Sequence, residues 1–364
     1  MRTRALSSWS LCAVLSLMSV VAHAEPYLAA RMGLKCIQCH VNPTGGGLRS
    51  TYGNIYAQTQ LPVTQLRDKE AEPWAGLIGK YIAIGGNVRA NYDRVDVPDS
   101  PNTSEFDLEE ARAYLDVSII PGRLSVYVDE RVAPGTAENM EANVRFWLRE
   151  GEMYVKAGKM YLPFGWRFED DNAFVRQASG IGMTAPDNGV EVGWERGAYT
   201  AQLALSNGTA GGPEDNTGKQ ASLRGEYVQS IWRAGASASF NDSELGDKRA
   251  YALHGAVRTG PVVWLGEVDY IDDKSLGLSG RKQVVSLAEA DWLIRQGHNL
   301  KLTYEFLDPD DDVDEDEQTR ASVVYELNPV EFLQLRVGAR VFDGIPQNDL
   351  QNRRQYFVQL HGFF

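Results

Sequence analysis

The chain has 364 residues, of which 43% are hydrophobic and 23% are charged, and its formal net charge at pH 7 is −13. A chain this acidic lacks the basic surface that binds nucleic-acid phosphates, so we expect no nucleic-acid partner. After the first two dozen residues, no apolar run reaches the roughly 18 residues that a transmembrane helix needs. The mean hydropathy is −0.33, which also argues against a helical membrane protein.

The N-terminus has the pattern of an export signal. Two arginines precede an apolar stretch at residues 11–21, and an Ala-His-Ala sequence suited to cleavage ends at residue 24. We therefore predict a signal peptide at residues 1–24 and an exported chain that begins at Glu25. The leader takes Cys12 with it, so the mature chain keeps two cysteines.

Those two cysteines belong to a C-x-x-C-H motif, Cys36, Cys39 and His40, which is the attachment signature of c-type haem. The thiols of such a motif bond to the haem vinyl groups, and the imidazole is placed to become the proximal iron ligand. A structural zinc site would need four ligands, and a thioredoxin-type redox pair would need a βαβ context. A bare disulfide is the remaining alternative. We predict one covalent haem c on Cys36 and Cys39, with His40 on the iron.

The segment around the motif differs from the rest of the chain. Residues 25–74 show no strand-like alternation, so we predict that they form a haem-binding plug. Three glycines at positions 45–47 would let the backbone approach a flat macrocycle closely. Four side chains are candidates to pack on the porphyrin face: Leu48, Tyr52, Ile55 and Tyr56.

From residue 75 onward, short segments alternate apolar and polar residues with a period of two, which is typical of half-buried strands. In residues 124–129 and 299–306, for example, one face is apolar and the other is polar or charged. A soluble sandwich would bury the apolar face in a core. An outer-membrane barrel turns that face to lipid and its polar face to a wet lumen.

The links between these segments favour the barrel. Short links such as Pro121-Gly122 and Asn328-Pro329 alternate with long polar links such as residues 96–105 and 308–317. Periplasmic turns and extracellular loops alternate in this way, and the segments number 16. The chain also stops at Phe364, which resembles the insertion signal of outer-membrane barrels.

We therefore predict an all-β fold, a 16-stranded antiparallel outer-membrane β-barrel over residues 75–364 with the haem-binding plug at its N-terminal side. A barrel of this size encloses a wide lumen, which leaves room for the plug. The expected location is the outer membrane of a Gram-negative bacterium, with the apolar face against lipid.

With these features the sequence resembles the fused monohaem cytochrome c–porins of the outer membrane, a family best known from bacteria that oxidise ferrous iron outside the cell. The shared features are the leader, a single C-x-x-C-H motif, a short plug and a barrel that ends in Phe364. The barrel also resembles phosphate-selective porins in three stretches, residues 154–159, 162–165 and 187–191.

The resemblance implies that electrons cross the outer membrane through the haem. We expect transfer between an extracellular donor, ferrous iron above all, and periplasmic c-type cytochromes or other soluble carriers, so that the protein would act as an Fe(II) oxidase and electron conduit. One alternative is a substrate- or ion-diffusion porin whose haem plug gates or senses. Another is a peroxidase-type haem enzyme, which would need a distal site with acid–base groups. No such distal motif is visible.

The second axial ligand of the iron governs its potential and access, and the motif does not fix it. Strand parity places His254 and His361 on the lumen face, and Met32 lies close to the motif in sequence. These three residues are the distal candidates, and an open site is a further possibility.

Two of the long loops suggest additional roles. Residues 308–317 include eight carboxylates, which suit divalent cations such as ferrous iron or calcium, although such a run is commonly a solvated loop. Residues 160–187 form the longest loop and contain five aromatic side chains. This loop is expected either to fold into the pore as a constriction or to form an outer lid.

Overall fold

The computed structural model describes residues 25–364, apart from residues 69, 150, 169, 171, 215, 245 and 277–279. The predicted signal peptide, residues 1–24, lies outside the described residues. Within the described chain, strands begin at residue 77, and the segment before them forms helices and turns.

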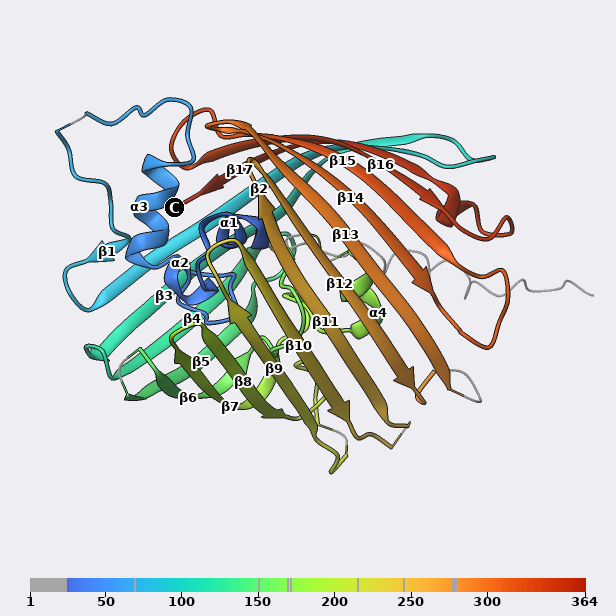
Figure 1. The fold of residues 1–364 in the computed structure, drawn as a ribbon, viewed down its shortest axis with the longest axis horizontal. Helices are drawn as coiled ribbons and strands as arrows, with labels where there is room; N and C mark the ends of the chain where they lie inside the picture. Colours follow the sequence, from blue (N-terminus) through green and yellow to red (C-terminus); the bar gives the residue numbers. More distant parts are fainter. Residues whose placement is uncertain are drawn as a thin grey trace, which may run out of the picture.

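Sixteen antiparallel strands, β2 to β17, form a closed barrel (Figure 1). Each strand pairs with its neighbours in sequence, and β17 pairs with β2 to close the sheet. The predicted 16-stranded barrel is therefore confirmed, and one short extra strand, β1 (Leu77–Ile78), pairs with the start of β2. The barrel strands are β2 (Ile82–Asp96), β3 (Thr103–Ile120), β4 (Leu124–Ala133), β5 (Glu138–Arg149), β6 (Met153–Met160), β7 (Asp187–Arg196), β8 (Tyr199–Ser206), β9 (Gln220–Val228), β10 (Trp232–Asn241), β11 (Lys248–Thr259), β12 (Val262–Asp273), β13 (Arg281–Arg295), β14 (His298–Asp308), β15 (Gln318–Leu327), β16 (Leu333–Asp343) and β17 (Arg354–Phe363).

The two ends of the barrel differ in the length of their links. Short turns close one end, for example residues 260–261 between β11 and β12, and longer loops close the other, for example residues 309–317 between β14 and β15. The C-terminal residues join the short-turn end, because the backbone N–H of Phe363 donates to the carbonyl of Phe332 in the β15–β16 turn. In outer-membrane barrels this end faces the periplasm.

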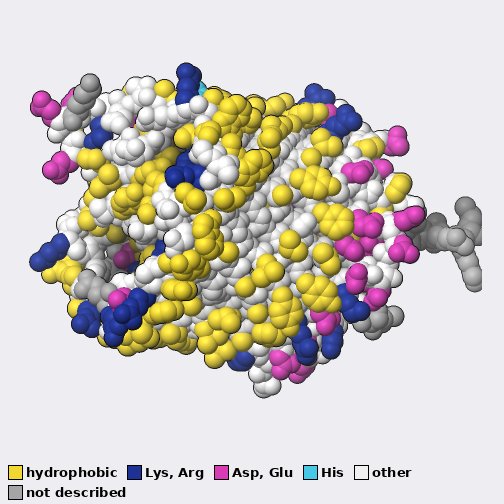
Figure 2. Space-filling view, in the orientation of Figure 1, with side chains coloured by type: hydrophobic (Ala, Val, Ile, Leu, Met, Phe, Trp, Pro, Cys, Tyr) yellow, Lys and Arg dark blue, Asp and Glu magenta, His cyan; other side chains and the backbone are white. Residues whose placement is uncertain are grey.

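The outer wall of the barrel is apolar. Successive residues of each strand alternate between an outward apolar side chain and an inward polar one, as in Leu253 and His254, of which the first is 68% exposed and the second 5%. Apolar side chains cover the outside of the strands, with acidic groups gathered at the long-loop end (Figure 2). This surface suits a hydrocarbon bilayer.

Aromatic rings border the apolar wall at the short-turn end. Trp194, Tyr199, Tyr227 and Trp232 form a row on adjacent strands, with neighbouring ring centroids 4.8–6.2 Å apart. Such girdles mark the membrane interfaces of transmembrane barrels. The closed barrel, its apolar wall and its girdle place the protein in the outer membrane of a Gram-negative bacterium, in contact with lipid.

The helices of the described chain are short, and none is long and apolar enough to cross a membrane. They are α1 (Pro26–Met32), α2 (Cys36–Cys39), α3 (Thr51–Thr59), α4 (Phe174–Ser179) and the 3-10 helix η1 (Asp349–Asn352). Helices α1 and α2 lie within the barrel, and α3 lies near its short-turn end (Figure 1). Helix α1 packs on β11 and β12 from the inside.

The longest loop, residues 161–186, also folds into the barrel. Residues 161–168 are all buried, and α4 within the loop packs on β12, β13 and β14. Of the two expected placements, the structure has the constriction within the pore and not the outer lid. We call residues 161–186 the lumen loop.

Candidate functional site

The barrel wall fixes helix α1 at both ends. The helix begins with Pro26, and Gly33 ends it in the left-handed conformation with φ of 65°. Gly33 lies against the β9–β10 turn, where a Cβ would come within 2.6 Å of the Cα of Ser230. The Tyr27 hydroxyl donates a 2.7 Å hydrogen bond to Glu326 on β15. Because of these contacts, Met32 at the end of α1 has a defined position.

The haem motif leads into a hairpin. His40 and Arg49 form an antiparallel bridge, and Val41 N–H donates to the Leu48 carbonyl. The glycines at 45–47 make the turn of this hairpin, with φ of 93°, 80° and 65°. A Cβ on Gly47 would lie 2.3 Å from the Tyr127 hydroxyl on the wall, so this glycine is required by the barrel and not by a macrocycle.

The three motif side chains line one cavity between the plug and the barrel. Its unfilled space is about 1050 Å³, a volume that includes solvent at the open side of the cavity. Its lining is Glu25, Pro26, Leu28, Ala29, Met32, Cys36, Cys39, His40, Thr44, Gly45, Arg49, Gly53, Tyr56, Ala57, Leu61, Trp166, Arg167, Arg224, Asn328, Gln334, His361 and Phe363.

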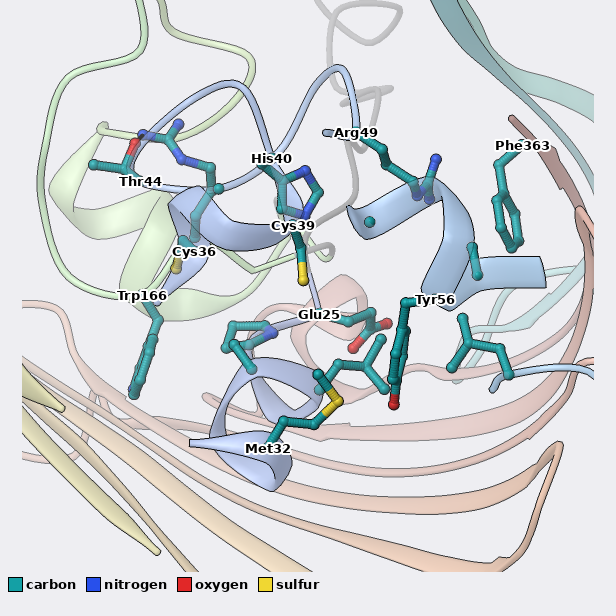
Figure 3. A pocket seen from close by; sticks show the side chains of 18 of the residues that line it. Glu25, Met32, Cys36, Cys39, His40, Thr44, Arg49, Tyr56, Trp166 and Phe363 are labelled. Carbon is teal, nitrogen blue, oxygen red and sulfur yellow. Dashed lines mark hydrogen bonds between the residues drawn. The ribbon is translucent and has the colours of Figure 1, made fainter. Parts of the chain in front are cut away.

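Figure 3 shows how the side chains that line the cavity are placed around it. The sulfur atoms of Cys36 and Cys39 point into the space, and His40 and Met32 lie on opposite sides of it. Trp166 and Tyr56 stand on the two flanks. The side chains that a c-type haem needs therefore converge on one space.

The two thiols are free, and no disulfide joins Cys36 to Cys39. Burial and the neighbouring Cys36 raise the pKa of the Cys39 thiol to about 11. Redox-active C-x-x-C pairs instead depress a cysteine pKa to form the attacking thiolate. The environment thus argues against a thioredoxin-type role for the pair.

His40 is held as a neutral imidazole. Burial, with the Arg49 guanidinium nearby, lowers the pKa of His40 to about 3. Backbone hydrogen bonds with Gly47 and Gly46 in the hairpin turn oppose this shift in part. Neutral imidazole is the form that ligates metals, so His40 suits the proximal position.

The three distal candidates do not share one place. Met32 and His361 line the cavity with His40. His254 is also turned inward, as parity predicted, but it packs on Trp166 with ring centroids 5.0 Å apart and does not line the cavity. Met32 and His361 are therefore the two distal candidates that line the same cavity as His40.

Three arginines line the cavity, of which Arg224 pairs with Glu226 at 3.2 Å, while Arg49 and Arg167 bring positive charge to the space. Arg49 places its guanidinium 4.4 Å from the Phe363 ring centroid, and burial lowers its pKa. Arg167 from the lumen loop donates to the Thr44 hydroxyl at 2.6 Å. Within the described chain, neither guanidinium has a salt bridge to a carboxylate. An anionic group in the cavity would find two partners there.

Much of the rest of the lumen is filled, and smaller cavities remain along its wall. Charged side chains of the inner wall pair with one another, for example Arg112 of β3 with Glu110 of the same strand at 3.1 Å and with Asp129 of β4 at 3.2 Å. The following wall side chains have an exposed fraction of 0%: Arg89, Glu110, Asp129, Glu191, Asp291, Glu305 and Glu326. The wide wet lumen expected of a 16-stranded barrel is occupied here by the plug, the lumen loop and these ion pairs.

The four side chains that the sequence suggested would pack on the porphyrin face lie in different places. Tyr56 lines the cavity, whereas Leu48 is buried against Tyr114 and Tyr127 of the wall. Tyr52 and Ile55 face outward from α3. No group of three or more described His, Cys, Asp or Glu side chains is arranged to hold a metal ion, and this includes the acidic residues 308–317.

Sequence reasoning missed several cavity residues. Trp166 is 1% exposed, and the carboxylate of Glu267 on β12 accepts a 2.7 Å hydrogen bond from its backbone N–H. Phe363 and Gln334 come from β17 and β16. The aromatic content of the lumen loop was the only local signal, because the other contacts are made across the barrel.

No protein-family model and no curated protein matches the sequence. Solved structures with the same fold are outer-membrane porins. OmpT, an outer-membrane protein of Vibrio cholerae, has a TM-score of 0.60 and 12% identity, over 78% of this chain and 100% of that one. The anion-selective porin from Comamonas acidovorans has a TM-score of 0.59 and 12% identity, over 78% and 99%. The channel DcaP of Acinetobacter baumannii has a TM-score of 0.56 and 13% identity, over 83% and 100%.

At these identities the likeness concerns the fold. The chain has a porin-like outer-membrane barrel.

Proposed function

We propose that the protein is an outer-membrane cytochrome c–porin that passes single electrons between an extracellular donor and a periplasmic carrier. The observation that carries the proposal is the convergence of Cys36, Cys39 and His40 on one large cavity inside the barrel. In each transfer one ferrous ion outside loses an electron and becomes ferric, and one periplasmic cytochrome gains that electron.

The residues around the cavity fit one covalent haem c. Cys36 and Cys39 would form the thioether bonds, and His40 would ligate the iron as a neutral imidazole. Arg49 and Arg167 would bind the two propionates. When bound, the haem would supply an iron centre that changes reversibly by one electron.

The other cavity residues would exclude water from such a group. Leu28, Ala57 and Phe363 contribute apolar surface, and Trp166 and Tyr56 flank the space. A dry surround limits the rearrangement of solvent that accompanies a change of charge, and it tunes the potential.

The filling of the lumen supports electron transfer over solute diffusion. A diffusion pore keeps its inner charges hydrated, whereas here inner-wall side chains such as Asp129 and Glu305 are fully buried in ion pairs and under the lumen loop. An electron needs no open channel. The acidic long-loop end, which includes exposed carboxylates of residues 308–317, would raise the local concentration of a ferrous cation.

The second candidate is a porin whose haem plug gates or senses. The likeness of the barrel to solved porins favours it. It requires that the plug or the lumen loop move to open a path, and a solute flux would then be measurable.

One experiment separates the two functions. The holoprotein is placed in liposomes that contain a trapped electron acceptor, ferrous iron is added outside, and the ion conductance of the same preparation is recorded. The matched control is the barrel with Cys36→Ser and Cys39→Ser, which lacks covalent haem. We expect reduction of the acceptor by the holoprotein only, with a low conductance for both.

The gated porin would be established instead if holoprotein that carries its haem lets small solutes pass freely and never reduces the acceptor. Reduction by the double variant would show that the electrons leak past the protein.

A further inference from the structure

We propose that the sulfur of Met32 is the second axial ligand, opposite His40. This inference deepens the proposed function and rests on it. The juxtaposition that carries it is that Met32 and His40 face each other across the space into which the two motif sulfurs point (Figure 3).

The side chains around the cavity are placed as two axial ligands would need. His40 and the Met32 sulfur lie on opposite sides of the space into which the Cys36 and Cys39 sulfurs point. A haem held by the two sulfurs would therefore have one of these residues available on each side.

The wall holds Met32 in this place. Asn299 of β14 accepts a 2.9 Å hydrogen bond from Arg31, and Arg258 of β11 donates at 2.6 Å to the Arg31 carbonyl. Gly33 follows directly and has no room for a Cβ. The neighbours of Met32 on both sides are thus bound to the barrel, which fixes the place from which its side chain enters the cavity.

The other donors that line the cavity are held by the barrel wall. The Glu25 carboxylate accepts a 2.6 Å hydrogen bond from Lys301. His361 on β17 lies beside Phe363, with ring centroids 5.0 Å apart, and its Nδ1 is 3.4 Å from the Gln334 side-chain oxygen. A contact at Nδ1 does not prevent Nε2 from ligating, so Met32 is preferred to His361 for its place opposite His40, and the Met32→Leu variant distinguishes the two.

The chemistry of a thioether suits the proposed function. His/Met ligation raises the potential of a c-type haem relative to other axial pairs, and ferrous iron is a donor that demands a high potential. A ligand on both axial positions also leaves no place for peroxide, so it argues against the peroxidase alternative.

The test compares Met32→Leu with Met160→Leu in the purified holoprotein. Leucine keeps the apolar volume and removes only the sulfur. Met160 is a matched control, because it is buried at 0% exposure in the same barrel and does not line the cavity. Three readouts are taken: the long-wavelength ferric absorption band of sulfur–iron coordination, the midpoint potential, and binding of carbon monoxide to the reduced protein.

We expect the wild type and Met160→Leu to show the band and to resist carbon monoxide. Met32→Leu should lose the band, bind carbon monoxide and shift in potential, and Met32→His should restore resistance to carbon monoxide with a lower potential. Haem content measured by mass separates the outcomes. Wild type without haem defeats the proposed function, whereas haem-loaded wild type that lacks the band, or haem-loaded Met32→Leu that keeps it, defeats only the assignment of Met32. If Met32→Leu does not fold, the band in the wild type alone decides.

Discussion

The lumen loop and the plug occupy the same barrel in different ways. In the lumen loop, Phe164, Trp166 and Phe168 pack into a continuous hydrophobic cluster with wall residues such as Val263 and Leu287. In the plug, Tyr27 and Ala30 of α1 join the same cluster, but α1 and α2 also border the cavity that the motif side chains line. The loop packs on the wall, whereas one side of the plug faces the cavity.

The two segments also differ in how polar contacts tie them to the wall. Asp170 of the lumen loop lies 2.9 Å from Arg320 and 3.0 Å from Arg340, and Arg176 pairs with Glu267. The plug also makes ion pairs with the wall, Lys35 with Glu195 at 3.2 Å and Glu25 with Lys301 at 2.6 Å, but its Arg49, which lines the cavity, has no salt bridge to a described carboxylate. The comparison predicts that loss of the haem loosens the plug and leaves the lumen loop in place.

The largest expected effect follows from removing the two thiols. Cys36→Ser with Cys39→Ser should abolish covalent haem and expose the plug, but not the lumen loop, to proteolysis. The mass of the mature chain and the positions of the cleavage sites are the measurements. A single Cys36→Ser variant is the control, since it keeps one attachment point. An unmodified wild-type mass from a host competent in cytochrome c maturation would contradict the cofactor.

A second, smaller effect is expected from the lumen loop. Trp166→Ala should destabilise the loop by about 3–5 kcal/mol, the usual cost of truncating a buried tryptophan, and the ion conductance of the barrel should rise several-fold. Trp264→Ala is the control, because Trp264 faces lipid on β12 and is 50% exposed. Equal conductance in the two variants would show that the loop does not close the lumen.

The barrel could be predicted from the sequence because each strand and each link can be recognised from a short stretch of the chain. Each strand must alternate its faces, so residues such as 299–306 reveal both the strand and its orientation, and the alternation of link lengths gives the order of the two ends. Nothing local distinguishes a lumen loop from an outer lid. The aromatic residues of 161–186 would be needed in either position.

The cavity was only partly predictable. The motif gave Cys36, Cys39 and His40, but parity gives the face on which a residue lies and not its height in the barrel or its angle around the axis. His254 and His361 had the same parity, and only His361 lines the cavity. Trp166 and Phe363 are far from the motif in sequence, and the closed barrel brings them to the cavity.

The smallest expected effect concerns the ion pairs that Asp170 of the lumen loop forms with Arg320 and Arg340, and it depends on pH. Burial would raise the pKa of Asp170, but Arg320 and Arg340 lower it from 3.8 to about 2. A carboxylate with a depressed folded-state pKa stabilises the fold above its unfolded pKa and loses that contribution as the pH falls through the folded value. Asp170→Asn should therefore destabilise the loop by about 2 kcal/mol at pH 7.

The effect should shrink between pH 4 and pH 2, where the wild-type carboxyl also becomes neutral. Hydrogen exchange in α4, corrected for the intrinsic rate at each pH, measures it, with Asp107→Asn at the exposed end of β3 as the control. Glu305 keeps the Arg320 guanidinium paired in the variant, whereas Arg340 loses its contact with Asp170, so the measured loss includes the charge of Arg340. Equal exchange in Asp170→Asn and wild type at pH 7 would mean that the loop is held by its hydrophobic cluster alone, and the contrast between the two segments would then lie in packing and not in charge.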